Sequence, residues 1–304
     1  MISVLGAIQH LADGTAVMTV YAVPAIAICV IAGLLLIAAA VLGCKLMNRK
    51  KAKPAAELRE CPDVWAVHEQ GAREYQEDSY VVSDADKADV YGILAVVSDG
   101  MGGLEKGDQV SDTVVTTAIN GFYRMQGDGD QILLALLTWA NQAVNGLLGA
   151  AQQGKSGATV VMGLVRNGKF HYLSVGDSRI CLYREGKLIQ LNREHVFRNE
   201  LMLRVVNKET TFQEALSHPR AAGLTGYLGQ GQLKHVDLPA QPVEVCPGDK
   251  FILMSDGVYN ALSAEEISEA LDKDANEAAE AIRKAVENKN YANQDNYTAV
   301  IIAC

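Results

Sequence analysis

The sequence has few cysteines, and their arrangement argues against zinc and dithiol chemistry. They are scattered along 304 residues, and no two have C-x-x-C spacing: Cys29, Cys44, Cys61, Cys181, Cys246 and Cys304. Zinc ribbons and dithiol oxidoreductases need such closely spaced thiols. A reduced, cytoplasmic environment is the simpler interpretation for the body of the chain.

Positive charge is also scarce. The chain has 27 Lys and Arg residues against 36 Asp and Glu residues, and its formal net charge is -9. Because no basic stripe runs through the body of the chain, the composition argues against a nucleic-acid-binding surface. The length is sufficient to bury a large core.

Charge of either sign is missing from Gly14 to Cys44. The almost wholly apolar part of this stretch is about 23 residues long and, as a helix, would span about 34 Å, whereas a bilayer core is about 30 Å thick. No Lys or Arg precedes the stretch, and five follow it directly: Lys45, Arg49, Lys50, Lys51 and Lys53. This asymmetry predicts one membrane span with its C-terminal side in the cytoplasm.

Two other interpretations of this segment are weaker. A cleaved signal peptide would carry its positive charge before the apolar run. The sequence VLGC at 41–44 loosely resembles a lipoprotein processing site, but Leu42 is bulky and the basic N-terminus is missing. The predicted organisation is a short extracytoplasmic N-terminus (1–20), a transmembrane helix (21–44), a basic juxtamembrane linker (45–62) and a folded domain (63–304).

The folded domain is predicted to be an antiparallel α+β layered structure. Groups of β-branched and aromatic segments predict strands, among them WAVHE, SYVVS, VYGILAVV, KFHYLSV, KHVDL, VEVC, KFILMSD and residues 297–303. Helices are predicted over 108–125, 130–152, 264–271 and 275–288. Asn167-Gly168 and Glu185-Gly186 are typical of hairpin turns, which favour antiparallel pairing. Residues 192–224 show no clean period and are predicted to be irregular.

Four acidic stretches stand at the ends of predicted strands: Glu77-Asp78, Asp99-Gly100, Asp256-Gly257 and Asp295-Asn296. Each of them alone is most simply a turn. Several carboxylates in one place repel each other unless a divalent cation holds them, and ligands that are all oxygen suit Mg²⁺ or Mn²⁺. The glycine after Asp99 would let its carbonyl approach a metal closely. Together the four stretches predict a divalent-metal site.

An ordered series of motifs runs from Val64 to Cys304: GAREYQED (71–78), VVSDGMGG (96–103), SGATVVMGLV (156–165), VGDSR (175–179), LNREH (191–195), HPRAAGLTGYLG (218–229), FILMSDGVYN (251–260) and QDNYTAVII (294–302). In this order they resemble the metal-dependent protein phosphatases of the protein phosphatase 2C type. Gln76 stands where that family usually has Asn, and Glu194 stands where it usually has Asp. Met101 stands where some members have a histidine that protonates the leaving group.

The resemblance implies a four-layer α-β-β-α sandwich, with two antiparallel sheets flanked by helices. It also implies two Mn²⁺ or Mg²⁺ ions in the cleft of the sandwich. Asp99 would bridge both ions, and Asp256 and Asp295 would complete the shell of one of them.

The other ion would be served by Glu77 or Asp78 together with the carbonyl of Gly100. Asp177 matches the aspartate that bacterial members use for a third, weaker metal. Arg73 matches the phosphate-binding arginine, so that Arg73 and Asp99 are the predicted catalytic residues.

The sequence thus predicts a single-pass membrane protein whose cytoplasmic domain hydrolyses phosphoserine and phosphothreonine in proteins. Two metals that share a water would lower its pKa and direct it at phosphorus. The predicted partners are phosphoproteins, among them a transmembrane Ser/Thr kinase and its substrates. The alternative is a membrane-tethered phosphoprotein-binding or scaffold module with little catalysis.

Overall fold

The computed structural model describes residues 4–10, 16–22, 61–101 and 106–304. It divides the chain into two compact units, residues 1–56 and 57–304. In the first unit, strands β1 (Val4–His10) and β2 (Ala16–Ala22) form an antiparallel pair. Strand β2 takes in the first two residues of the span predicted over 21–44. The rest of that prediction, and the linker up to residue 60, lie outside the described residues.

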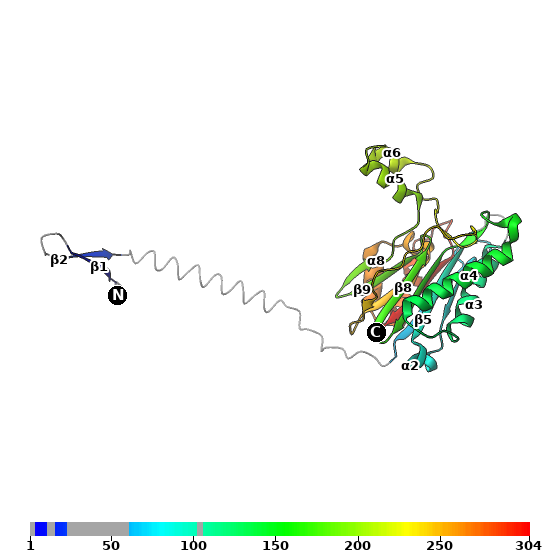
Figure 1. The fold of residues 1–304 in the computed structure, drawn as a ribbon, viewed down its shortest axis with the longest axis horizontal. Coiled ribbons are helices and arrows are strands. Elements are labelled where there is room, and N and C mark those ends of the chain that lie inside the picture. The colour runs from blue at the N-terminus through cyan, green and yellow to red at the C-terminus, as the bar shows by residue number, and fades with distance from the viewer. Residues whose placement is uncertain (1–3, 11–15, 23–60, 102–105) are drawn as a thin grey trace. The chain divides into compact units, whose positions relative to one another are not determined.

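The second unit contains two antiparallel sheets (Figure 1). One has five strands in the order β10 (Lys187–Gln190), β9 (Arg179–Arg184), β12 (Lys250–Met254), β13 (Tyr297–Ala303) and β3 (Asp63–Glu69). The other has six: β11 (Val243–Glu244), β8 (Lys169–Val175), β7 (Val160–Arg166), β5 (Ile93–Met101) and β4 (Asp78–Val82) in that order, with β6 (Gly157–Ala158) also paired to β5.

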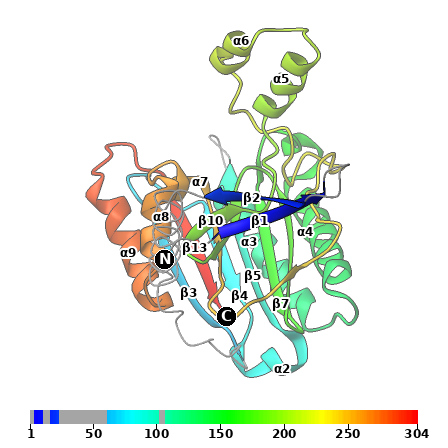
Figure 2. The same cartoon turned by 90° about the vertical axis from the view of Figure 1, so that its left-hand side faces the viewer.

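Helices cover the outer face of each sheet (Figure 2). The six-stranded sheet packs against α3 (Gly107–Phe122) and α4 (Gly129–Gln152), and the five-stranded sheet packs against α8 (Ala264–Leu271) and α9 (Ala275–Asn288). Between the sheets lies a third apolar layer, in which the rings of Phe170 and Phe251 stack with centroids 3.8 Å apart. The predicted four-layer sandwich is confirmed.

Two tight turns set the register of neighbouring hairpins. Asn167 and Gly168 have φ of 52° and 71° between β7 and β8, and Glu185 and Gly186 have φ of 53° and 76° between β9 and β10. Two successive residues with positive φ match the right-handed twist of the strands they join. Both predicted turns are confirmed.

Helix α4 is the one helix of the described residues that is long and apolar enough to cross a membrane. Its inner face, with Leu133, Leu136 and Leu137 almost wholly buried, packs in the core against α3 and the six-stranded sheet. It is therefore a core helix of the folded domain, and it says nothing about the span predicted over 21–44.

Some segments differ from the sequence prediction. Residues 192–224 are not irregular throughout, because they contain α5 (Phe197–Val206) and α6 (Phe212–Ser217). The sequence of this segment shows no helical spacing of apolar residues because the two short helices bury little. Of their residues only Leu201 and Ala215 are buried. In both views α5 and α6 project from the body of the domain (Figures 1 and 2).

The other differences concern strand ends. The segment KHVDL is not a strand and contributes only a bridge between Asp237 and Ser174, and VEVC is reduced to the two residues of β11. Residues 90–91 belong to α2 (Ala88–Tyr91), which follows the single turn η1 (Ala85–Lys87), and β5 begins after Gly92. Gly92 has φ of 82°, a conformation that ends the helix.

Candidate active site

Four strand ends bring predicted acidic residues to one edge of the two sheets. Asp78 begins β4 and is the register partner of Asp99 near the end of β5. Asp256 is the first residue of α7 (Asp256–Tyr259), with one residue between it and the end of β12, and Asp295 precedes β13, the antiparallel neighbour of β12. Because one antiparallel strand ends where its neighbour begins, these carboxylates meet at the same edge of the sandwich.

Asp78 joins the two sheets. Its Oδ2 accepts a hydrogen bond from Ser255 Oγ at 2.6 Å and another from Thr298 Oγ1 at 2.7 Å, and Thr298 Oγ1 also lies 2.9 Å from His68 Nδ1. The residue is 3% exposed. Burial raises the pKa of Asp78 to about 7, and the charges of neighbouring aspartates act in the same direction, against the two hydrogen bonds.

Asp99 lies in the field of four other aspartates. Burial holds the pKa of Asp99 well above its usual range, and the charges of nearby carboxylates add to the effect: Asp78, Asp256, Asp177 and Asp295. Burial and the charge of Asp256 raise the pKa of Asp177 to about 6, and burial and the charge of Asp295 raise the pKa of Asp256. Carboxylates gathered in this way suit divalent cations, whose charge would offset the repulsion.

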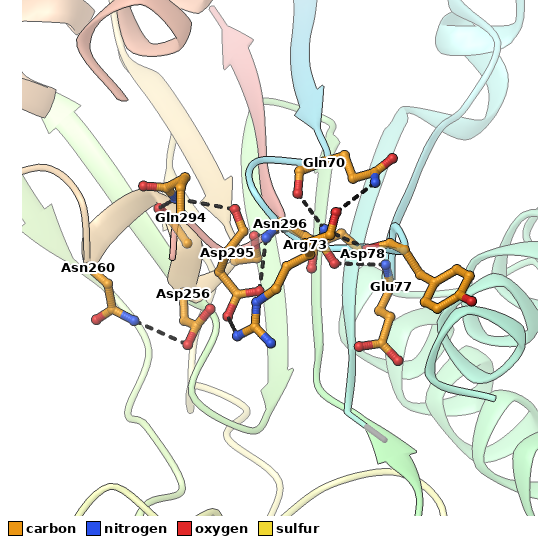
Figure 3. A network of polar contacts seen from close by, with 12 residues as sticks. Gln70, Arg73, Glu77, Asp78, Asp256, Asn260, Gln294, Asp295 and Asn296 are labelled. Carbon is orange, nitrogen blue, oxygen red and sulfur yellow. Dashed lines mark hydrogen bonds and ion pairs between the residues drawn. The ribbon is translucent and has the colours of Figure 1, made fainter. Parts of the chain in front are cut away.

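Arg73 supplies positive charge at the rim of this cluster. Its Nη2 lies 2.6 Å from Asp295 Oδ2, and its charge lowers the pKa of Asp256 against the effect of burial (Figure 3). The side chains of Arg73 and Asp295 are 55% and 37% exposed. A planar guanidinium that solvent reaches can grip two oxygens of a phosphoryl group.

Asn296 holds the loop that carries Arg73 and Glu77. Its Oδ1 accepts a hydrogen bond from the Glu77 N–H at 2.8 Å, and its Nδ2 donates to the carbonyls of Gln70 at 2.7 Å and Tyr75 at 2.9 Å (Figure 3). The asparagine is 5% exposed. Sequence reasoning assigned it no role, although it is part of the QDNYTAVII motif.

Asn296→Ala is expected to lower the free energy of unfolding by about 2 to 4 kcal/mol, because three hydrogen bonds are lost and buried backbone groups are left unpaired. Activity is expected to fall about tenfold through the displaced loop. Urea unfolding and steady-state kinetics measure the two effects. The control Asn207→Ala removes a long, exposed hydrogen bond to Glu209 on the α5–α6 segment and should change stability by less than about 0.5 kcal/mol. An equal loss in both variants would contradict the role of Asn296.

Gly100 lies where three segments meet. A Cβ atom at this position would lie 2.2 Å from the Gly107 carbonyl oxygen and 2.6 Å from that of Glu77, and a Cβ at Gly107 would lie 2.2 Å from Glu77 Oε1. Only glycine permits such an approach. Burial is the largest cause that raises the pKa of Glu77, and the charge of Asp108 is the second. Asp108, which the motifs did not single out, therefore adds negative charge beside Glu77.

The residues present suit a hard divalent cation. The cluster offers carboxylate oxygens and the Gly100 carbonyl, which is the donor set that Mg²⁺ and Mn²⁺ prefer. Of the two candidates for one ion, Asp78 has its Oδ2 engaged by Ser255 and Thr298, whereas the Glu77 carboxylate accepts no hydrogen bond from the described residues. Glu77 is therefore the better placed donor.

A different group of possible metal ligands consists of Asp128, Asp130 and His171. His171 pairs in register with Leu164, which pairs with Leu94 at the start of β5, so this group lies at the opposite end of that strand from Asp99. His171 Nδ1 is 2.8 Å from Asp130 Oδ1. The buried histidine is thus engaged by a neighbouring side chain, which is consistent with a structural role.

Comparison with known proteins decides the family. Residues 70–294, more than half of the chain, match the profile of the family described as protein phosphatase 2C. The chain belongs to the protein phosphatase 2C family. A putative protein phosphatase 2C-type from Streptococcus pyogenes is 32% identical over 180 residues, which cover 57% of this chain and 70% of the relative. The Listeria welshimeri serine/threonine phosphatase stp is 26% identical over 223 residues, covering 69% of this chain and 83% of the relative.

Solved structures of family members have the same fold. The Mycobacterium tuberculosis serine/threonine phosphatase PstP/Ppp superposes with a TM-score of 0.65 at 26% identity, covering 80% of this chain and 98% of that structure. The PPM Ser-Thr phosphatase MsPP from Mycobacterium smegmatis, in complex with cacodylate, has a TM-score of 0.63 at 29% identity. The match covers 79% of this chain and 97% of that structure. A structure of the PstP catalytic domain in complex with two manganese ions has a TM-score of 0.62 at 25% identity, covering 80% of this chain and 97% of that structure.

Proposed function

We propose that the chain is a metal-dependent protein serine/threonine phosphatase that uses Mn²⁺ or Mg²⁺ and hydrolyses phosphoserine and phosphothreonine in proteins. The observation that carries the proposal is the convergence of five carboxylates beside an accessible guanidinium, Arg73. The relatives named serine/threonine phosphatases and the related structure with two manganese ions support it.

Each residue of the cluster has a proposed role. Asp99 would hold the cations together with Asp256 and Asp295. Glu77 and the Gly100 carbonyl would supply further oxygen ligands, and Asp177 would offer an additional, weaker position. These roles account for every acidic residue that the sequence predicted as a ligand except Asp78.

Asp78 is proposed to position the site rather than to donate to an ion. Its two hydrogen bonds tie β4 to the ends of β12 and β13 and thereby fix Asp99 relative to Asp256 and Asp295. The carboxylates would hold cations that lower the pKa of a bound water and that offset the repulsion between these carboxylates and the phosphoryl oxygens. Arg73 orients the phosphoryl group for in-line attack.

The membrane segment predicted over 21–44 would confine the enzyme to the cytoplasmic face of a membrane. A linker of 18 residues (45–62) reaches at most about 60 Å, so the domain would meet membrane-bound phosphoproteins at a raised effective concentration. A transmembrane Ser/Thr kinase and its targets are the proposed substrates.

The test of the proposed function is hydrolysis of a phosphothreonine peptide by the full-length chain purified in detergent, with Mn²⁺ or with chelator. Activity that requires the cation supports the phosphatase. Tight binding of the peptide with no hydrolysis under either condition would favour the alternative, a membrane-tethered phosphoprotein-binding module.

Arg73→Ala is expected to raise KM for phosphopeptide by about ten- to a hundredfold and to lower kcat less, because the lost bidentate contact acts mainly on substrate binding. Steady-state kinetics with Mn²⁺ measures both constants. Arg73→Lys keeps the charge but not the planar fork and should recover only part of the loss. KM values equal to that of the wild type in both variants would contradict the role of Arg73.

A further inference from the structure

A pocket of about 390 Å³ lies directly beside the acidic cluster. Its lining is formed by the start of α7 and by the turn that leads into β13: Gly257, Asn260, Ala261, Tyr291, Ala292, Asn293, Gln294 and Asp295. Asp295 belongs both to this pocket and to the cluster, so the two sites share a wall.

The wall between the two sites is fixed by hydrogen bonds to backbone carbonyls and by close backbone approach. Gln294 Nε2 donates to the Gly257 carbonyl at 3.0 Å, and the Ala72 N–H donates to the Gln294 carbonyl at 2.8 Å. A Cβ atom at Gly257 would lie 2.0 Å from the Asn296 carbonyl oxygen, so α7 and the turn are in close contact. The pocket is therefore built on the same backbone that places Arg73 and Asp295.

The lining is suited to a cationic side chain. Tyr291 is 51% exposed, and the face of a tyrosine ring attracts ammonium and guanidinium groups. Asn260 Nδ2 donates to Asp256 Oδ2 at 3.1 Å, and its carbonyl oxygen is turned away from that carboxylate (Figure 3). None of the described residues that line the pocket is Lys or Arg, and Asp295, the acid of the lining, has its Oδ2 paired with Arg73 at 2.6 Å on the side of the cluster.

The charge of the surrounding domain acts in the same direction. The first 60 residues carry six of the 27 Lys and Arg residues but only three of the 36 Asp and Glu residues. The domain that follows is therefore more acidic than the chain as a whole, and its field favours basic over acidic peptides.

We propose that this pocket is a subsite for a lysine or arginine side chain close to the phosphorylated residue of the substrate. The inference rests on the proposed phosphatase function, since it takes the phosphoryl group to lie at Arg73. An extended peptide advances about 3.3 Å per residue, so a side chain within three residues of the phosphorylated one can reach a pocket that shares Asp295 with the cluster. An acidic side chain would find no Lys or Arg among the lining residues to pair with, because Arg73 is engaged by Asp295 and is proposed to bind the phosphoryl group.

The test compares phosphothreonine peptides that differ at one position, with Lys, Ala or Glu at each of the three positions on either side. The full-length chain with Mn²⁺ is expected to show kcat/KM about tenfold higher for Lys than for Glu at one of these positions, mainly through KM. The ratio of the two values does not depend on how much active enzyme a preparation contains.

Three variants locate the preference. Asn293→Lys places a cation in the pocket and should bring the Lys-to-Glu ratio to about one or invert it. Tyr291→Ala removes the ring and should lower the ratio about threefold, whereas Tyr291→Phe keeps the ring face and should retain it. The matched control Thr138→Lys adds the same charge on the exposed side of α4, among residues outside the pocket, and should leave the ratio unchanged.

The remaining outcomes would refute either the subsite alone or the proposed phosphatase function as well. Hydrolysis of all peptides with equal kcat/KM, or a preference that Asn293→Lys and Thr138→Lys change alike, would refute the subsite while leaving the phosphatase in place. Absence of cation-dependent hydrolysis of every peptide by the wild type would refute the proposed function and the subsite with it.

Discussion

Asp99→Asn is expected to lower kcat by about a thousandfold or more, the largest effect of any single substitution in this protein. The amide keeps the size of the side chain but removes the charge that is proposed to hold both ions, so the attacking water loses its activation and its position together. Steady-state hydrolysis of a phosphothreonine peptide at saturating Mn²⁺ measures the loss.

The same substitution should stabilise the protein when metal is absent. Burial and four neighbouring carboxylates oppose the ionisation of Asp99, so its neutral replacement removes repulsion from the metal-free cluster. The melting temperature in chelator is therefore expected to rise while activity disappears. Asp112→Asn, an exposed acid on α3, is the matched control and should change neither quantity. An active Asp99→Asn variant would refute the shared role of this carboxylate.

Removal of divalent cations is expected to reduce activity to the background of the assay and to lower the melting temperature by roughly 5 to 10 °C. A cation at about 100 times its dissociation constant adds about 2.7 kcal/mol to the free energy of unfolding, and about 1 kcal/mol shifts the melting temperature of a domain of this size by about 2 to 4 °C. Thermal unfolding in Mn²⁺ and in chelator measures the difference.

The difference between the melting temperatures in Mn²⁺ and in chelator should grow with pH. In the metal-free fold the pKa values of Asp78 and Asp177 are raised from 3.8 to about 7 and about 6. Between about pH 4 and pH 7 the folded state therefore binds more protons than the unfolded state, and the contribution of these groups to stability falls as pH rises. Bound cations would offset the negative charge that appears in the cluster as those protons leave. The melting temperature in chelator should decline from pH 5 to pH 7.5 more steeply in the wild type than in Asp99→Asn, and equal slopes would contradict the electrostatic account.

The parts of this protein that sequence reasoning predicted well are governed by local chemistry. The turns at Asn167-Gly168 and Glu185-Gly186 follow from the positive φ that each requires, and the strands of the core follow from continuous apolar runs bounded by such turns. Helices α5 and α6 were missed for the converse reason, because helices that bury so little leave no period in the sequence.

The amino-acid sequence by itself determined which chemistry the domain can perform: it placed carboxylates at strand ends, an arginine before the first of them and no soft ligand beside them, in the order of a known family. Only the tertiary structure showed which of those groups are already engaged by other residues. Asp78 is engaged by Ser255 and Thr298, which are 177 and 220 residues away, and Asn296 holds a loop more than 200 residues distant. Spacing along a chain constrains the direction of side chains within one helix or strand. Contacts between two facing sheets depend instead on how the layers pack. Different roles for the neighbouring residues Glu77 and Asp78 could therefore be proposed only from the packed sheets.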